Sequence, residues 1–179
     1  MSSPVFIIPG YGDSGPTHWQ SLWQEKNKEF IRVVQRSWDD PQCAEWVDKL
    51  DTAVRDSGPK TILVAHSLGC LLVAHWAAAS SHQVAAALLV APPDPLAAVF
   101  PPAIQGFAPV PLRRLPFPTI LVASSNDSYA TPAFTAKCAT AWGSELVDIG
   151  PAGHINSASG LGDWPKGRTL LAKLRTSPG

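Results

Sequence analysis

Ser67 lies in a pentapeptide, Ala65-His66-Ser67-Leu68-Gly69, whose pattern is typical of a nucleophilic serine. An apolar run at residues 61–65, predicted as a strand, precedes it, and an apolar run at residues 68–80, predicted as a helix, follows it. A sharp strand-to-helix turn holds the serine hydroxyl clear of the backbone and needs small residues two positions before and after the serine. Ala65 and Gly69 meet this requirement, so the sequence predicts a nucleophile turn at Ser67.

A serine hydroxyl is a poor nucleophile at neutral pH unless a base takes its proton and a carboxylate orients that base. Both groups should follow other strands, because the carboxyl ends of parallel strands meet at one edge of a sheet. Asp127 follows the apolar run at 119–123, and His154 follows the run at 145–149. The chain order Ser67, Asp127, His154 is that of the α/β-hydrolase triad, so we predict these three catalytic residues.

Other carboxylates and histidines are alternatives to this assignment. Asp94, after the preceding predicted strand, is the second candidate for the carboxylate, whereas Asp148 lies within a strand. Asp127 could instead only cap the helix that follows it. The remaining histidines are interpreted as structural: His66 at the free position of the turn and pointing away from Ser67, His75 within a helix, His82 near a helix end, and His18 in the first turn of a surface helix.

Acyl transfer also requires hydrogen-bond donors for the negatively charged oxygen of the tetrahedral intermediate. The backbone N–H of Leu68, directly after the predicted nucleophile, is the first expected donor. The second should come from the glycine-rich loop at residues 9–15, where we assign Tyr11 N–H, with Gly12 as the alternative. A phosphate-binding loop is a rival interpretation, but neither the dinucleotide nor the P-loop glycine spacing is matched.

The elements that must position these groups alternate between strands and helices. Six apolar runs are predicted as strands, at residues 5–8, 31–35, 61–65, 84–91, 119–123 and 145–149. Most are continuously apolar, as in a parallel sheet covered on both faces, and the repeated β-α order predicts a doubly wound α/β fold. The helix start signals are Thr17 with Gln20 (a capping box), Asp40 with Pro41, Thr131 with Pro132, and Pro165, and the end signals are Gly58 and Gly143.

Residues 92–118 break this alternation. They contain nine of the chain's 18 prolines and many large apolar side chains. Such proline density excludes regular helix or strand over most of the segment. It is predicted as an irregular cover over the sheet and, compatibly, as an apolar lid beside a substrate site. With no shift in composition along the chain, we expect one domain over residues 1–179.

Composition excludes several classes of protein. Fourteen basic and 14 acidic residues balance to a net charge of +0, which argues against a nucleic-acid-binding protein. A hydrophobic content of 45% with 16% charged residues excludes disorder. Three scattered cysteines are predicted as buried thiols in a reducing compartment. No apolar run reaches about 18 residues and the start lacks a basic region, so we expect a cytoplasmic protein without a membrane span.

These motifs together resemble the YdeN / retinoblastoma-binding-protein type serine hydrolase family, over nearly the whole chain. The resemblance implies a minimal α/β-hydrolase fold: three α/β/α layers around a six-stranded, mainly parallel sheet in the order 2-1-3-4-5-6, without a cap domain. The mammalian family member is named for binding a pocket protein through an L-x-C-x-E sequence. We do not extend this interaction to the present chain, because residues 68–72, the nearest run to that sequence, lack its glutamate. The matching motifs are Pro9-Gly10-Tyr11, His18-Trp19-Gln20, Trp38-Asp39-Asp40-Pro41, the Ser67 pentapeptide, Asn126-Asp127, Gly153-His154-Ile155-Asn156 and Gly162-Asp163-Trp164-Pro165.

The residues therefore predict a serine hydrolase that forms an acyl-enzyme, with a small-molecule ester as substrate. The family resemblance implies that this hydrolase is similar to carboxylesterases. The mechanism requires no metal and no cofactor. Two alternatives remain: amide or peptide hydrolysis by the same three residues, and a non-catalytic protein-binding module that kept the fold.

Overall fold

The computed structural model describes residues 3–176; residues 1–2 and 177–179, which the expected domain includes, lie outside the described part. Its six strands form one parallel sheet in the order β2-β1-β3-β4-β5-β6, which confirms the predicted fold class and strand order. The strands are β1 (Val5–Ile8), β2 (Phe30–Arg32), β3 (Ile62–His66), β4 (Ala86–Val90), β5 (Thr119–Ala123) and β6 (Glu145–Asp148).

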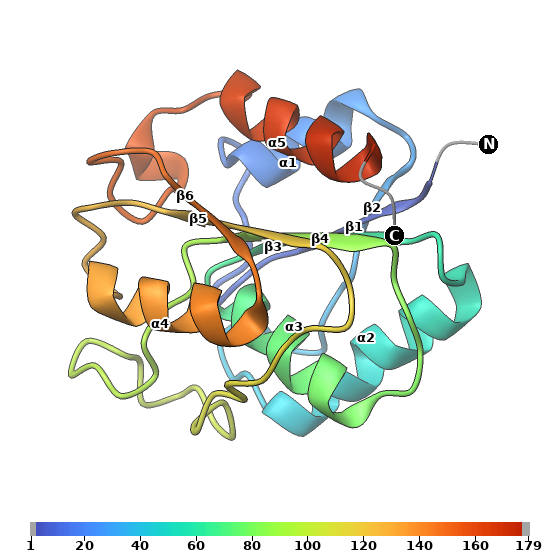
Figure 1. The fold of residues 1–179 in the computed structure, drawn as a ribbon, viewed down its shortest axis with the longest axis horizontal. Helices are drawn as coiled ribbons and strands as arrows, with labels where there is room; N and C mark the ends of the chain where they lie inside the picture. The colour runs from blue at the N-terminus through green and yellow to red at the C-terminus, as the bar shows by residue number, and fades with distance from the viewer. Residues whose placement is uncertain (1–2, 177–179) are drawn as a thin grey trace.

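Helices cover both faces of the sheet (Figure 1). On one face lie α2 (Cys43–Ser57), α3 (Leu68–Ala79) and α4 (Pro132–Trp142), and on the other lie α1 (Trp19–Lys26) and α5 (Pro165–Thr176). Each face buries its own hydrophobic cluster: Phe6 and Ile8 of β1 belong to one, and Val5 and Ile7 to the other. Successive side chains of a strand point to opposite faces, which is why strands covered on both sides are continuously apolar.

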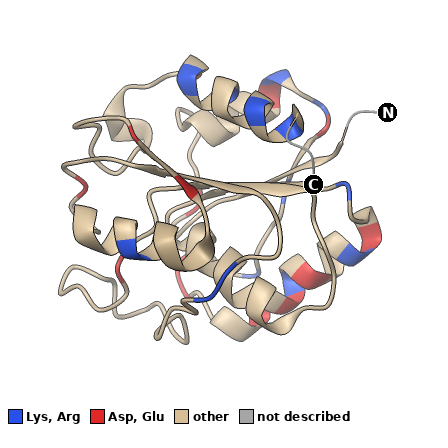
Figure 2. Ribbon diagram, viewed as in Figure 1, with Lys and Arg blue, Asp and Glu red and all other residues tan. Residues whose placement is uncertain are grey.

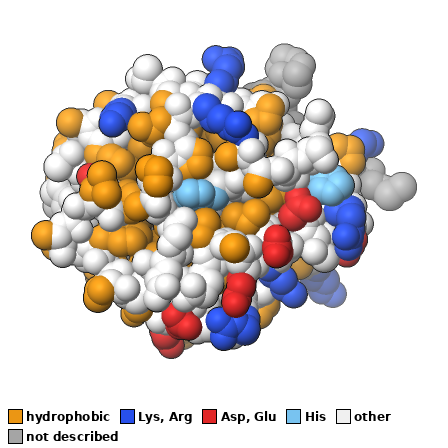
Figure 3. All heavy atoms as spheres, turned by 90° about the horizontal axis from the view of Figure 1, so that it is seen from below, with side chains coloured by type: hydrophobic (Ala, Val, Ile, Leu, Met, Phe, Trp, Pro, Cys, Tyr) orange, Lys and Arg blue, Asp and Glu red, His pale blue; other side chains and the backbone are white. Residues whose placement is uncertain are grey.

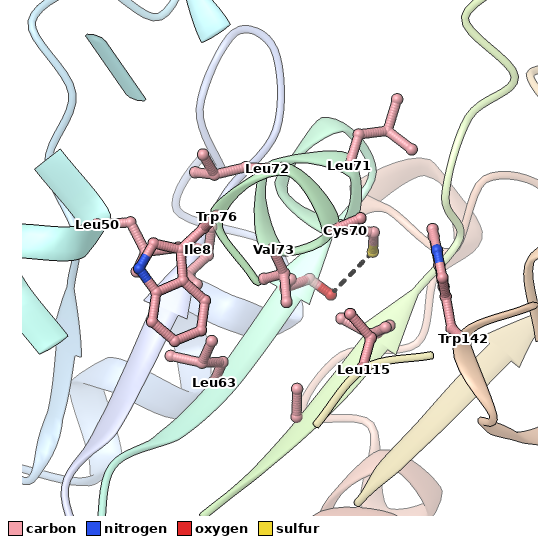
Figure 4. Packing of buried hydrophobic residues seen from close by; sticks show 14 of the residues in the cluster. Ile8, Leu50, Leu63, Cys70, Leu71, Leu72, Val73, Trp76, Leu115 and Trp142 are labelled. Carbon is pink, nitrogen blue, oxygen red and sulfur yellow. Dashed lines mark hydrogen bonds between the residues drawn. The ribbon is translucent and has the colours of Figure 1, made fainter. Parts of the chain in front are cut away.

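Helix α3 directly follows the predicted nucleophile turn and anchors it in the core. Eight of its 12 residues are buried, and their side chains pack between α2, the sheet and the end of α4 (Figure 4). The Cys70 thiol donates to the carbonyl oxygens of Ala65 and Val90, at 3.6 and 3.3 Å. The first turn of α3 is therefore tied to β3 and β4 from inside the core.

Helix α1 does not begin with the predicted capping box. Its N-cap is His18, whose Nδ1 accepts a hydrogen bond from the Gln20 N–H at 3.1 Å. The fully buried Gln20 side chain instead donates to the carbonyl oxygens of Ile8 and Val64, at 3.2 and 3.0 Å. The side chain of Gln20 thus joins β1 to β3, and these tertiary contacts determine where it goes.

Helix α2 also begins later than predicted, at Cys43 rather than after Asp40. The chain at Pro41 first pairs with the proline-rich segment: Gln105 N–H donates to Pro41 O, and Cys43 N–H donates to Gln105 O, each at 3.0 Å. This short bridge replaces the first helical turn. The other predicted boundaries at Gly58, Thr131, Gly143 and Pro165 are confirmed, and strand ends differ by a few residues, most at β2.

Among residues 3–176, the stretch 92–118 lacks helix and regular strand, as its prolines predict. Its second half is anchored to the core: Trp142 Nε1–H donates to Pro111 O at 2.9 Å, and His75 Nε2 lies 3.0 Å from Phe107 O. Between Pro95 and Ile104, by contrast, the backbone hydrogen bonds are local turns. This part of the segment is held to the core by the apolar contacts of Phe100 and Ile104 rather than by backbone hydrogen bonds.

Charged and apolar side chains are concentrated on different parts of the outer surface. Acidic and basic residues are interspersed, most densely along α2 (Figure 2). Figure 3 shows the face that carries α2, α3 and α4, and on this face apolar side chains gather on the half away from most of the acidic side chains. The exposed Leu96, Val99 and Leu112 belong to the proline-rich segment. Within residues 3–176, no helix has the length and hydrophobicity needed to cross a bilayer.

Candidate active site

The turn between β3 and α3 brings Ser67 to the carboxyl edge of the sheet. Ser67 has φ 55° and ψ −125°, a conformation that a residue with a β-carbon rarely adopts. A β-carbon on Gly69 would lie 2.4 Å from the carbonyl oxygen of Ile8, and one on Gly10 would lie 2.9 Å from Ser67 Cβ. The loop after β1 thus packs directly against the turn, and both glycines are required by this close approach.

The three side chains predicted to cooperate form one chain of hydrogen bonds. Ser67 Oγ lies 2.8 Å from His154 Nε2, and His154 Nδ1 lies 2.9 and 2.8 Å from the two carboxylate oxygens of Asp127. The side chains of His154 and Asp127 are 10% and 4% exposed. Because the carboxylate accepts from Nδ1–H, a neutral imidazole has its lone pair at Nε2, where it accepts from the serine hydroxyl.

The carboxylate alternatives are resolved by position. Asp127 Oδ1 also accepts from the N–H of Tyr129 at 2.9 Å, which orients the carboxylate. Asp94 instead accepts from the Leu96 N–H at 2.9 Å, and Asp148 from the Gly150 N–H at 2.7 Å. Within the described residues neither of these carboxylates contacts His154, so Asp127 is the partner of the imidazole. The cap of α4 is Thr131, not Asp127.

Two polar side chains to which the sequence analysis assigned no role of their own hold the loop of His154. Ser124 Oγ accepts from the Ala152 N–H at 2.9 Å, and Asn126 Oδ1 accepts from the Gly153 N–H at 2.7 Å. Their position in the polar run just before Asp127 was the signal that could have identified them. The loop after β5 therefore supplies both the carboxylate and the backbone support for the histidine.

Two backbone amides at the cavity of Ser67 have no acceptor within the described residues. The amides of Leu68, the first residue of α3, and Tyr11 donate to no group within residues 3–176. Both residues line the same cavity as Ser67. The alternative donor, the Gly12 N–H, is already bonded to the carbonyl oxygen of Trp38 at 3.0 Å. This geometry favours the predicted pair, Tyr11 and Leu68, over Gly12.

Two histidines lie closer to the site than the sequence indicated. His66 Nε2 is 2.9 Å from the carbonyl oxygen of His154, so its side chain has a partner in the site. His18 was expected on a surface helix, but it is 4% exposed and its ring packs 4.7 Å from that of His66. Burial, with Arg32 and His154 nearby, lowers the pKa of His18 from 6.5 to about 4. The cap that His18 makes for α1 turns its ring inward, a contact that no local pattern reveals.

The cavity at Ser67 has a volume of about 410 Å³. We call the lining apolar side chains of the proline-rich segment the apolar wall, and the lining polar residues the polar wall. Its volume is suited to a small molecule. The apolar wall is formed by Pro93, Phe100, Pro101 and Ile104, and the polar wall includes Asp13, Asn156 and Ser157.

Comparisons with known proteins agree with this geometry. A sequence model described as "serine hydrolase" matches residues 5–173. A structure described as a YdeN-like hydrolase from Pectobacterium atrosepticum has 33% identity and a TM-score of 0.85, with 97% of this chain and 91% of that chain covered. The ydeN gene product of B. subtilis has 21% identity and a TM-score of 0.76 over 98% of this chain and 100% of that one. A monoacylglycerol lipase from Paleococcus ferrophilus, 13% identical with a TM-score of 0.72 over 98% and 96% of the two chains, shares the fold. No curated protein matches the sequence.

Proposed function

The chain belongs to the serine hydrolase family and has the α/β-hydrolase fold, and we propose that it is a carboxylesterase that cleaves small esters through an acyl-enzyme on Ser67. The observation that carries the proposal is the continuous hydrogen-bond chain from Ser67 Oγ through His154 to Asp127. The amides of Tyr11 and Leu68, which have no acceptor in the described part of the chain and line the cavity at Ser67, support it as an oxyanion site.

In the first half of the reaction, His154 Nε2 takes the proton of Ser67 as Oγ attacks the ester carbonyl carbon. The imidazolium that forms donates its Nδ1–H to Asp127, whose buried negative charge stabilises it. The imidazolium then donates its Nε2–H to the leaving oxygen, and the alcohol departs as the acyl-enzyme forms. In the second half, water gives its proton to Nε2 and attacks the acyl carbon, which releases the acid and restores the Ser67 hydroxyl.

The negative charge on the substrate oxygen develops next to the amides of Tyr11 and Leu68. Leu68 N–H is at the amino end of α3, where the helix dipole adds to the attraction. Removing one donor of this kind from an enzyme costs about 10²- to 10³-fold in kcat. Only a proline substitution would delete the Tyr11 N–H, and its ring would also fix φ, so the contribution of Tyr11 is better tested through Gly10, whose place leaves no room for a side chain.

The proposed substrate is an ester with a short acyl or aromatic group. The apolar wall of the cavity, with Phe100 and Ile104, supports an uncharged group at this position. We propose that residues 92–118 act as a lid-like cover within a single domain, since this segment supplies the apolar wall and its backbone hydrogen bonds between Pro95 and Ile104 are local turns. The three free, buried cysteines support a reducing, cytoplasmic location.

The test combines a fluorophosphonate probe with p-nitrophenyl esters of increasing acyl length and matched anilides. We expect the probe to label the wild-type protein and the Ser81→Ala variant, whose exposed serine is a matched control, and to leave Ser67→Ala unlabelled. Short esters should be cleaved much faster than anilides. Faster anilide cleavage would favour an amidase, and folded wild-type protein that is neither labelled nor active would favour the non-catalytic alternative.

A further inference from the structure

The side chain of His66 joins the turn that carries Ser67 to the loop that carries His154. It directly precedes Ser67, and its Nε2 lies 2.9 Å from the carbonyl oxygen of His154. A carbonyl oxygen only accepts, so Nε2 bears the proton and His66 is the donor. His66 is 5% exposed, which protects this hydrogen bond from competition with water.

The other contacts of the His154 loop come from different directions. Asn126 holds the amide of Gly153, and the indole N–H of Trp19 donates to the carbonyl oxygen of Ile155 at 2.9 Å. Ile155 itself has φ 49°, a left-handed conformation that is unfavourable for a β-branched residue, so the loop needs external contacts to keep this shape. Among these contacts, that of His66 is the one that comes from the nucleophile turn.

The geometry points to His66 as a positioning residue: its Nε2–H fixes the backbone of His154 so that the imidazole stays within hydrogen-bond distance of Ser67 Oγ. This inference rests on the proposed function. Displacement of a reacting group by about 1 Å can lower the rate about 10²-fold, so a single backbone hydrogen bond at this place has a large effect on turnover.

His18 supports this arrangement from the other side. Its ring meets that of His66 edge-on, with centroids 4.7 Å apart, and its own Nδ1 is held by the start of α1. Burial, together with His18 and His154, lowers the pKa of His66 well below its usual value. A neutral His66 keeps the Nε2–H donor without adding a positive charge that would oppose protonation of His154. Arg32 is a nearby cation, and its positive charge helps to lower the pKa of His18.

Two substitutions separate the hydrogen bond from simple packing. His66→Gln places an amide N–H near the position of Nε2, whereas His66→Leu fills similar space without a donor. We expect His66→Leu to lower kcat about 10²-fold at a nearly unchanged KM and to slow the fluorophosphonate labelling of Ser67 by a similar factor. His66→Gln should recover most of the loss in both kcat and labelling rate. Should His66→Leu fail to fold, His66→Asn replaces it, because its shorter amide does not reach the carbonyl.

His75→Leu is the matched control, since His75 also lies within hydrogen-bond distance of a backbone carbonyl, that of Phe107, at 3.0 Å. It should lose stability but keep kcat within about twofold of the wild type, because that contact lies outside the hydrogen-bond chain at Ser67. Folded His66→Leu with wild-type kcat overturns the inference, and so do equal losses in the Leu and Gln variants. Wild-type protein without Ser67-dependent activity would overturn the proposed function as well, so the two failures are distinguishable.

Discussion

Replacing Asp127 with asparagine tests the proposed role of the carboxylate with almost no change in shape. One corner of the carboxylate, Oδ1, accepts from the Tyr129 N–H as well as facing His154, while Oδ2 faces His154 Nδ1 at 2.8 Å. In the asparagine variant, Tyr129 will keep the amide oxygen at the Oδ1 position. The amide NH₂ then points at Nδ1 and stabilises the tautomer with its proton on Nε2, which cannot accept the Ser67 proton.

The magnitude follows from two losses. Turning the amide around would leave the partly buried Tyr129 N–H without its acceptor, which costs up to about 1–3 kcal/mol and reduces the competent tautomer by up to about 5- to 150-fold. The neutral amide also no longer stabilises the imidazolium, and a hydrogen bond to a charged group contributes about 1.5–3 kcal/mol, or about 10- to 150-fold. Together these effects predict a loss of about 10³-fold in kcat, equivalent to about 4 kcal/mol.

The assay is steady-state hydrolysis of p-nitrophenyl acetate, with unfolding in urea as the check on structure. Asp94→Asn is the matched control, because that carboxylate accepts from Leu96 N–H and does not contact His154. It should keep kcat within a few-fold of the wild type. An Asp127→Asn variant that retains more than about a tenth of wild-type kcat, or an Asp94→Asn variant that is equally impaired, would refute this reasoning.

Further predictions concern strain, pH and close packing. Ser67→Gly should be about 1 kcal/mol more stable than Ser67→Ala in urea unfolding, since both lack the hydroxyl but glycine relieves a positive φ of 55°; equal stabilities would contradict the idea of strain. His18, with its pKa lowered from 6.5 to about 4, should contribute up to about 3 kcal/mol to the free energy of unfolding above pH 6.5, and this is lost as the pH falls toward 4. Between pH 7.5 and 4.5, the free energy of unfolding should depend less on pH in His18→Asn, which keeps a capping oxygen, than in the wild type. In the control variant His82→Gln, its pH dependence should be that of the wild type. Gly69→Ala should lower stability by 3 kcal/mol or more, about the cost of a severe clash, because its β-carbon would lie 2.4 Å from a backbone oxygen, whereas Gly15→Ala, with nothing within 4 Å, should be tolerated.

Much of the site was predictable because its signals are local. The pentapeptide around Ser67 reflects close packing within a single turn, and the positions of Asp127 and His154 after apolar runs follow from the geometry of parallel sheets. Helix ends at Gly58 and Gly143 were predictable for the same reason, since a cap depends on its immediate neighbours.

The errors arose where a distant segment competed for a local group. Gln20 fits a capping box, but two buried carbonyl groups of β1 and β3 take its side chain. The start of α2 is displaced by pairing with Gln105, far along the chain. In both places a contact with a residue distant in the sequence replaces the local pattern.

By itself, the sequence determined the alternation of strands and helices, the turn at Ser67 and the chain order of the three residues proposed as catalytic, because periodicity and steric requirements act between near neighbours. Only the tertiary structure decided that Asp127 rather than Asp94 contacts His154. It also decided that the Gly12 N–H donates to the carbonyl oxygen of Trp38 and that His66 binds the carbonyl oxygen of His154. The His154 contacts join residues 27 and 88 positions apart, and such distances depend on how the loops pack at the edge of the sheet. Hydrogen bonds are formed or lost over fractions of an ångström, a scale that the order of residues alone does not specify.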